Sequence, residues 1–175
     1  MCMASIVLGG GCFWCVEGAL KGLRGVSSLV PGYSGGEVEN PTYEQVCAKI
    51  TGHAEVVRVI FDPEVLGLRT LFEVFFTCHD PTQLNRQGND IGSHYRSVIF
   101  YSDDMQRLDA ESVIANLSSS FSKPIVTEVS PLINFFPAEE YHHDYFTNNP
   151  RNPYCITVVS SKISKTRAEH STLYD

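Results

Sequence analysis

The residues best suited to chemistry in this sequence surround Cys12, in the run GGGCFWC at residues 9–15. An apolar run before it predicts a strand, and apolar periodicity after it predicts a helix. Cys12 is therefore expected at a helix N-terminus, where unpaired backbone N–H groups and the helix dipole favour a thiolate. The glycines let a substrate approach the sulfur. On these residues alone, a structural cysteine in a glycine turn is the alternative interpretation.

Two aromatic residues, Phe13 and Trp14, follow the cysteine directly. Two rings beside a nucleophile can form an apolar pocket for a methyl group or a thioether. The pattern alone favours core packing for at least one of them, because apolar residues at the start of a helix usually face the rest of the fold.

Cys12 and Cys15 form a C-x-x-C pair, whose spacing suits either a redox disulfide or half of a metal site. No second C-x-x-C follows, and the other Cys and His residues do not recur at zinc-ligand spacing, so we predict no metal site. Cys47 and Cys78 lie in apolar helical stretches and are expected in the core. The His142-His143 pair lacks a third spaced ligand and is expected on the surface.

Further polar residues lie next to turns and strand ends, and each is a weak signal by itself. They are Tyr43, Glu55, Asp90 and Tyr95. Glu55 begins a predicted strand, where surface placement is the usual fate of a glutamate. His53, His79 and His94 have the chemistry of general bases, but isolated loop histidines more often have structural hydrogen-bonding roles, so we leave them unassigned.

The elements that must position these residues follow the order β-α-β-β-α-β. The predicted strands are residues 4–8, 28–34, 54–62 and 96–102, and the predicted helices are 12–21 and 68–80, with a short helical stretch at 43–47. This order predicts an α+β fold, a ferredoxin-like plait with a mixed sheet. A further helix is expected at 103–120 and a further strand at 125–130. From residue 131 we expect a long irregular C-terminal segment, with a short helix at 138–146 and an extended piece at 155–160.

Length and charge narrow the class of protein. The 175 residues suit a single domain, 1–175, with one core. A net charge of -7 disfavours nucleic acid and anionic lipid as partners, because such binding requires clustered Lys and Arg. No stretch resembles a signal peptide or a membrane span, so a cytoplasmic location is expected. In that reducing compartment, six cysteines call for a catalytic, metal or core explanation.

The sequence resembles the methionine sulfoxide reductase A family over nearly the whole chain. The matching motifs are GCFW at 11–14, NPTYEQVC at 40–47, TGHAEVV at 51–57, FDP at 61–63, HDPTQLNRQGNDIGSHYRS at 79–97 and PAEEYHHDYF at 137–146. The resemblance implies an oxidoreductase that reduces methionine-(S)-sulfoxide, free or in proteins, and so repairs oxidised proteins.

The resemblance also implies roles for individual residues. Cys12 corresponds to the nucleophile, while Phe13 and Trp14 match the rings that hold the substrate's methyl group, which replaces the expectation of core packing. The groups that match the binding site of the sulfoxide oxygen are Tyr43, Glu55 and Tyr95, with Asp90 supporting them through water. A Glu55 desolvated among aromatic rings has a raised pKa and can act as a general acid.

Recycling is the step at which the sequence departs from the family pattern. Attack leaves Cys12 as a sulfenic acid, which a second thiol converts to a disulfide. The resemblance points to Cys155, in NPYC, as that resolving thiol and to thioredoxin as the reductant. It implies no metal or nucleotide cofactor. We expect a monomer. However, Cys15 stands where glycine is frequent, and the tail lacks the usual glycine-rich segment and additional cysteine. Cys155 ranks first and Cys15 second, and Cys15 as an inert helix residue is the third possibility.

Two other functions compete with this interpretation. A thioredoxin-like disulfide oxidoreductase would use Cys12 and Cys15, but it leaves Tyr43, Glu55 and Tyr95 without a role. A non-catalytic metal-binding or interaction domain would use the Cys and His residues instead.

Overall fold

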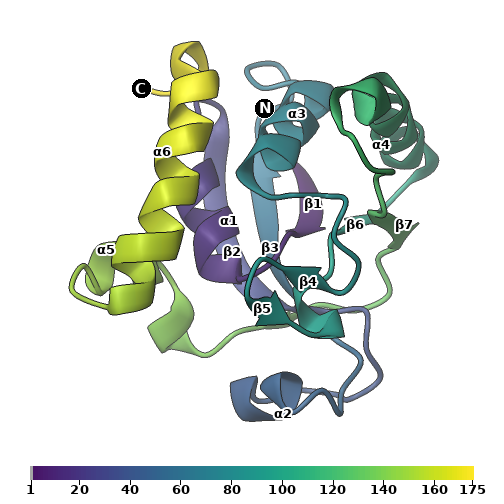
Figure 1. Ribbon diagram of the computed structural model, residues 1–175. Coiled ribbons are helices and arrows are strands. Elements are labelled where there is room, and N and C mark those ends of the chain that lie inside the picture. Colours follow the sequence, from purple (N-terminus) through teal and green to yellow (C-terminus); the bar gives the residue numbers. More distant parts are fainter. Residues whose placement is uncertain (1) are drawn as a thin grey trace.

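The computed structural model describes residues 2–175 as one six-stranded sheet with its long helices packed against one face (Figure 1). The strand order is β7-β6-β1-β3-β2-β8. The strands of this sheet are β1 (Ala4–Gly9), β2 (Val26–Ser34), β3 (Ala54–Phe61), β6 (Val98–Tyr101), β7 (Glu128–Pro131) and β8 (Phe136–Pro137). The helices are α1 (Phe13–Leu20), α2 (Tyr43–Cys47), α3 (Leu68–Cys78), α4 (Asp104–Leu117), α5 (Tyr145–Asn148) and α6 (Ser160–Glu169).

The ferredoxin-like plait predicted from the sequence is confirmed. Its elements β1, α1, β2, β3, α3 and β6 follow one another along the chain, and the four strands lie in the order β6-β1-β3-β2, all antiparallel to their neighbours. The appended strand β7 pairs with β6 in parallel, which makes the sheet mixed. The two crossovers through α1 and α3 place both helices on the same face of the sheet.

Alternation along β3 decides which of its side chains reach the helices. Val57 and Val59 belong to the main core between sheet and helices, whereas Val56 belongs to a smaller cluster on the opposite face, covered by Leu132 and Phe135. Because side chains two residues apart share a face of a strand, Glu55 has the same orientation as Val57 and faces the helical layer. The strand thus carries a carboxyl group into the core side of the sheet.

The helical layer consists of α1, α3 and α6, which lie side by side in front of the sheet in Figure 1. Close approach of α1 and α6 depends on Gly18, because a Cβ at this position would lie 2.6 Å from Cδ1 of Ile163. Among residues 2–175, no helix combines the length and apolar composition that a membrane crossing requires.

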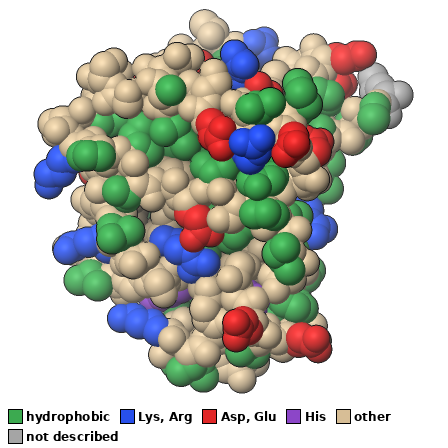
Figure 2. All heavy atoms as spheres, turned by 90° about the vertical axis from the view of Figure 1, so that its right-hand side faces the viewer, with side chains coloured by type: hydrophobic (Ala, Val, Ile, Leu, Met, Phe, Trp, Pro, Cys, Tyr) green, Lys and Arg blue, Asp and Glu red, His purple; other side chains and the backbone are tan. Residues whose placement is uncertain are grey.

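Helix α4 packs at the β6-β7 end of the sheet and lies on the upper part of the face seen in Figure 2. Charged side chains of both signs are interspersed on this face, and Arg107 pairs with Asp104 at 3.4 Å and with Glu111 at 3.2 Å. Exposed pairs of this kind each stabilise a helix only slightly. The polar-faced helix predicted for residues 103–120 is thus confirmed, with a short 3-10 turn at Ser118–Ser120 completing it.

The prediction of an extended piece at residues 155–160 is wrong. The segment Cys155–Val159 (η4) is a π-helical turn that continues directly into α6. Cys155 and Val159 are buried while Ile156 is exposed, which is the burial pattern of a helix packed on one side. The β-branched residues of this segment favour a strand by propensity, but packing against α1 overrides that preference.

Three smaller features differ from the sequence expectations. The short helix predicted at 138–146 is a 3-10 turn at Glu140–His142 and a separate α5, divided by Asp144 with a φ of 53°. The strand β8 was not predicted. The loop between α3 and β6 contains a two-stranded hairpin, β4 (Arg86–Gln87) and β5 (Asp90–Ile91), and a 3-10 turn, η1 (Ser93–Tyr95).

Candidate active site

The turn between β1 and α1 places Cys12 where the sequence predicted it, as the N-cap of α1. Gly11 has a φ of +87°, which is accessible to glycine and strained for other residues. A Cβ at Gly10 would lie 2.9 Å from the imidazole of His79. The glycines are therefore required by the backbone conformation and by the close approach of α3's C-cap residue.

Glu55 lies almost completely buried opposite this turn, with 1% of its surface exposed. Its Oε1 accepts a hydrogen bond from the backbone N–H of Phe13 at 3.2 Å, and its Oε2 has no partner among residues 2–175. Burial raises the pKa of Glu55 to about 8, and the Phe13 amide only partly opposes this shift. The surface placement expected from the strand pattern alone is wrong, whereas the raised pKa expected from desolvation is found.

Two phenols face the same carboxyl group from different elements. Tyr43 begins α2 and Tyr95 ends η1. Burial is the main cause that raises the pKa of each phenol, and the charge of Glu55 acts in the same direction, so both hydroxyls stay neutral donors. The structure therefore brings three of the residues selected from the sequence to one place.

Helix α2 is held in position by two sets of hydrogen bonds. Thr42 forms a capping box with Gln45, in which each side chain accepts from the other's backbone N–H. Glu139 Oε2 accepts from the backbone N–H of Tyr43 at 2.9 Å, while its Oε1 accepts from the hydroxyl of Tyr33 at 2.9 Å. Glu139 thus connects α2 to β2, a role that sequence reasoning missed although the residue lies in the PAEEYHHDYF segment.

Cys12 and Cys15 lie one helical turn apart, with the backbone N–H of Cys15 donating to the carbonyl of Cys12 at 3.0 Å, and their thiols shift each other's pKa. Burial raises the pKa of Cys12, and the contact with Cys15 and the charge of Glu55 raise it further. The pKa of Cys15 is lowered, first by the neighbouring thiol of Cys12 and also by the charge of Lys162. The backbone amide of Trp14 at the start of α1 lowers the pKa of Cys12, in the direction expected from the sequence, but burial outweighs it.

An aromatic wall stands beside the thiol. Phe13 is completely buried and Trp14 is half-buried; the indole stacks on Tyr145 with ring centroids 3.7 Å apart. The indole N–H of Trp14 donates to Nδ1 of His142 at 3.1 Å. His142 is buried between these rings, so the surface placement expected for it is wrong; its indole partner comes from a distant part of the chain.

Asp90 and Tyr154 close the site from the C-terminal side. The hydroxyl of Tyr154 donates a hydrogen bond to Oδ2 of Asp90, and its ring packs edge-on to Trp14 at 6.0 Å. Asp90 thus makes a direct protein contact in addition to any water-mediated role. Sequence reasoning missed Tyr154, although NPYC places it immediately before Cys155, the cysteine singled out for recycling.

Cys155 itself is fully buried at the start of η4. Burial raises the pKa of its thiol, and the charge that adds to this effect is that of Cys15.

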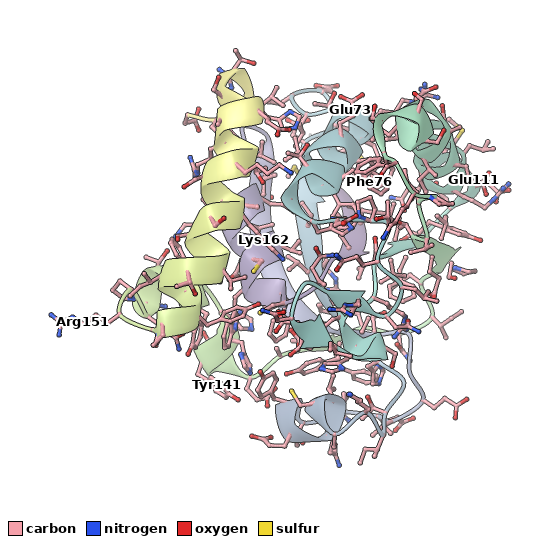
Figure 3. All side chains as sticks on the ribbon, in the orientation of Figure 1. Glu73, Phe76, Glu111, Tyr141, Arg151 and Lys162 are labelled. Atoms are coloured by element: carbon pink, nitrogen blue, oxygen red, sulfur yellow. The ribbon has the colours of Figure 1, made fainter. Side chains whose placement is uncertain are left out.

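Figure 3 shows Lys162 on α6 facing the space toward α3, where a cavity of about 660 Å³ is lined by Lys162, Phe76 and Cys78. Cys78 is in the core as predicted.

Of the remaining residues considered in the sequence, two histidines make structural hydrogen bonds and one cysteine lies next to the site. Nδ1 of His53 accepts from Gly36 N–H at 2.9 Å, and His79 Nε2 lies 2.7 Å from Ser97 Oγ, so both histidines have structural hydrogen bonds. Cys47, expected in the core, is half-buried and lies near Tyr43, at the end of the site that Glu55 occupies.

Comparisons with known proteins agree with this geometry. The family model described as peptide methionine sulfoxide reductase matches residues 4–173. A Saccharolobus solfataricus protein named peptide methionine sulfoxide reductase MsrA is 51% identical over 163 residues, which are 93% of this chain and 92% of the relative. The reduced form of Mxr1 from Saccharomyces cerevisiae has a TM-score of 0.83 at 34% identity, covering 87% of this chain and 89% of Mxr1. Mxr1 in complex with Trx2 has a TM-score of 0.60 at 25% identity, covering 81% and 84%.

Proposed function

The chain belongs to the peptide methionine sulfoxide reductase family, and from this premise we propose that its Cys12 reduces methionine-(S)-sulfoxide, both in proteins and free. It is an oxidoreductase that acts through thiols. Repair of oxidised proteins follows from the reaction, since a restored methionine regains its apolar character. The observation that carries the proposal is the contact between Glu55 and the backbone amide next to Cys12, which puts a protonated acid beside a thiol.

The hydrogen bond to Phe13 decides which oxygen of Glu55 carries the proton. Oε1 accepts from the backbone amide, so the proton belongs on Oε2. Oε2 is the atom left without a partner among the described residues, and it is therefore available to the oxygen of a bound sulfoxide. At neutral pH the raised pKa keeps this proton in place.

The two phenols complete the oxygen site. Tyr43 and Tyr95 stay protonated because burial and the nearby carboxyl group raise the pKa of each. They donate to the sulfoxide oxygen without adding charge, and donors aimed at developing negative charge stabilise a transition state. Phe13 and Trp14 form the apolar side of the site, which receives the methyl group.

The chemical step transfers one oxygen atom from the substrate to Cys12. The Cys12 sulfur forms a bond to the sulfoxide sulfur while Glu55 protonates the oxygen. The resulting hydroxyl group then moves to the Cys12 sulfur, and the bonds from the substrate sulfur to oxygen and to Cys12 both break. The products are methionine and a sulfenic acid on Cys12, so the substrate sulfur is reduced by two electrons and the cysteine sulfur is oxidised by two. The proton of the Cys12 thiol balances the proton that Glu55 has donated.

For recycling, we propose Cys15 as the first resolving thiol and Cys155 as the second, which reverses the order expected from the sequence. The support is proximity: the backbone N–H of Cys15 donates to the carbonyl of Cys12 at 3.0 Å, and the two thiols shift each other's pKa, whereas the thiol charge that acts on Cys155 is that of Cys15. Lys162 favours the Cys15 thiolate that must attack. Attack on the sulfenic acid forms a Cys12–Cys15 disulfide and releases one water molecule.

Thioredoxin is the dithiol reductant that we propose for this disulfide, supported by the similarity to Mxr1 in its complex with Trx2. A cytoplasmic location suits this chemistry because thiols there are kept reduced. We further propose that residues 1–175 act as a single domain and as a monomer, because each group used above comes from one chain.

Disulfide mapping tests the order of the two resolving thiols. Wild type is oxidised with one equivalent of methionine-(S)-sulfoxide, alkylated and digested, and the partner of Cys12 is identified by mass spectrometry. Cys15 is the expected partner in wild type and in the Cys155→Ser variant, and Cys78→Ser is the matched control for loss of a buried cysteine. Formation of a Cys12–Cys155 disulfide in wild type, at a rate that Cys15→Ser leaves unchanged, would contradict the proposal.

Substrate choice separates the reductase from its thioredoxin-like rival. With thioredoxin and its reductase supplying electrons, we expect consumption of the S sulfoxide epimer and none of the R epimer. Reduction of insulin disulfides without consumption of either epimer would support the rival instead.

A further inference from the structure

Three side chains with metal-ligand chemistry converge at the oxygen-binding end of the site. They are Cys47 from α2, Glu55 from β3 and His94 from η1. One ligand atom from each, a sulfur, a carboxylate oxygen and an imidazole nitrogen, lies within 4.8 Å of the other two. The three come from separate elements, which is why a search for zinc-ligand spacing along the sequence misses them.

Two of these side chains also have buried polar atoms without a partner. Among residues 2–175, Oε2 of Glu55 and Nδ1 of His94 make no hydrogen bond, although Glu55 is 1% and His94 3% exposed. An unpaired polar atom in a protein interior costs free energy, so two such groups beside one another indicate a ligand that contacts both. One of them already has a catalytic use in the proposed function, but His94 has none.

We propose that Cys47, Glu55 and His94 form a three-ligand site for Zn²⁺ with one open coordination position. Sulfur, nitrogen and carboxylate ligands are the set that zinc takes in proteins, whereas Ca²⁺ and Mg²⁺ require oxygen ligands. In tetrahedral zinc sites the ligand atoms lie about 3.3–3.7 Å apart, so side-chain movements of about 1 Å close this cluster around an ion. Cys47 is half-buried and gives the ion access from solvent.

Nearby charges both favour and oppose the binding of a cation by these three residues. The carboxylate of Asp90 acts on both Glu55 and His94, which favours a cation between them. Lys49 faces the same imidazole and opposes a cation. Binding requires the protons of Cys47 and Glu55 to leave, so zinc and the catalytic proton compete for the same carboxyl group.

The consequence for activity rests on the proposed function. Zinc on Glu55 removes the acid that protonates the sulfoxide and occupies the space of its oxygen. Substrate and zinc therefore exclude each other, and the ion is a reversible inhibitor that competes with methionine sulfoxide rather than a cofactor.

The test measures binding separately from activity. The C-x-x-C thiols and the terminal Cys2 can bind zinc by themselves, so the reference chain is the Cys2→Ser/Cys12→Ser/Cys15→Ser variant. Zn²⁺ affinity is measured by competition with a chromophoric chelator, and Co²⁺ serves as a spectroscopic probe of thiolate ligation. We expect one Zn²⁺ per chain and a thiolate-to-cobalt absorption band.

Added substitutions identify the ligands. Cys47→Ser should remove the cobalt band, and Cys47→Ser and His94→Gln should each weaken zinc binding by at least about 10-fold. Cys78→Ser, which removes a buried thiol outside the cluster, should leave both unchanged, and circular dichroism checks that each variant is folded. Absence of zinc binding to the reference chain would overturn the proposal. A zinc affinity that stays equal to that of the reference chain after Cys47→Ser and after His94→Gln would overturn it as well.

Inhibition is then measured with the complete enzyme. Zn²⁺ should raise the apparent KM for the sulfoxide, and His94→Gln, which retains the catalytic residues, should require at least about 10-fold more zinc for the same effect. Inhibition of His94→Gln at the wild-type zinc concentration would contradict a site that includes His94. If the chain binds zinc through these ligands but reduces no sulfoxide, the site stands and the proposed function fails.

Discussion

At the scale of single residues, the proposed mechanism makes the reactivity of Cys12 depend on the protonation of Glu55. Burial keeps Glu55 neutral at pH 7, because its pKa is raised to about 8. An ionised Glu55 would raise the pKa of the Cys12 thiol still further through its charge. The neutral acid therefore serves two purposes, since it supplies a proton to the substrate oxygen and makes the thiolate easier to form.

The substitution Glu55→Gln tests the role of the acid. A glutamine amide still donates a hydrogen bond to the sulfoxide oxygen but has no proton to transfer, so we expect kcat at pH 7 to fall by about 100-fold or more and KM to change much less. Wild-type kcat should also fall as pH rises through about 8, where Glu55 loses its proton, and the variant should lack this decrease. Steady-state kinetics on both proteins provide the comparison, and unchanged kcat in the variant would exclude Glu55 as the acid.

The sequence predicted which residues meet and, through the resemblance, the raised pKa of Glu55, but not the raised pKa of Cys12. The glycine turn and the helix that follows placed Cys12 at an N-cap, and the motif resemblance selected Tyr43, Glu55 and Tyr95. Their ionisation depends on burial and on contacts made by distant segments, which a local pattern does not contain. For the same reason the partners of Cys12 and the burial of His142 became visible only in the fold.

At the scale of elements, the stability of α2 depends on its contacts with the rest of the fold. A five-residue helix is not stable by itself, because helix nucleation costs more than so few hydrogen bonds return. The capping box of Thr42, the contact of Glu139 with the Tyr43 amide and the buried Val46 hold it in place. Tyr43 and Cys47 therefore owe their positions to tertiary contacts.

Loss of the cap should affect substrate binding more than chemistry. Thr42→Ala removes the hydrogen bond to Gln45 N, and such a loss costs about 1 kcal/mol of stability. We expect KM for the sulfoxide to rise by several-fold with a smaller change in kcat, because Tyr43 binds oxygen and does not transfer its proton. Asp103→Ala is the matched control, since Asp103 caps α4, which carries no site residue. Equal KM values in the two variants would contradict this role of α2.

The elements themselves were largely predictable from periodicity, and the exceptions have a physical cause. The strand pattern of residues 54–62 and the helical pattern of residues 68–80 predicted β3 and α3, which the structure places at Ala54–Phe61 and Leu68–Cys78. The segment Cys155–Val159 was mistaken for a strand because Ile, Thr and Val favour strands when packing is ignored. The two-residue strand β8 is too short to leave any periodicity.

At the scale of the whole molecule, two buried carboxyl groups make stability depend on pH. Burial raises the pKa of Glu55 to about 8 and that of Glu17, which lies under the segment around Asp144, to about 7. A raised folded-state pKa means that the folded protein binds protons more tightly than the unfolded chain. The stabilisation is complete below the unfolded pKa of 4.5 and is lost as pH rises through 7 and 8.

We therefore expect the free energy of unfolding to be lower at about pH 9 than at about pH 5, with Glu55 contributing up to about 4 kcal/mol of the difference. Urea denaturation at both pH values and at about pH 7 measures it. Glu55→Gln should remove the part of the loss that extends up to about pH 8, and Glu17→Gln the part that ends at about pH 7. A pH dependence identical to that of wild type in both variants would show that these groups do not carry the effect.

A single turnover without reductant tests the central claim most directly. Fully reduced enzyme is mixed with excess methionine-(S)-sulfoxide in the absence of thioredoxin or other thiols, and the methionine released is quantified. Wild type should release one methionine per chain if oxidation ends at the Cys12–Cys15 disulfide, or two if Cys155 takes over that disulfide and frees Cys12, and then stop, while Cys12→Ser should release none. Methionine release by Cys12→Ser at the wild-type level would contradict the assignment of the oxygen transfer to this thiol.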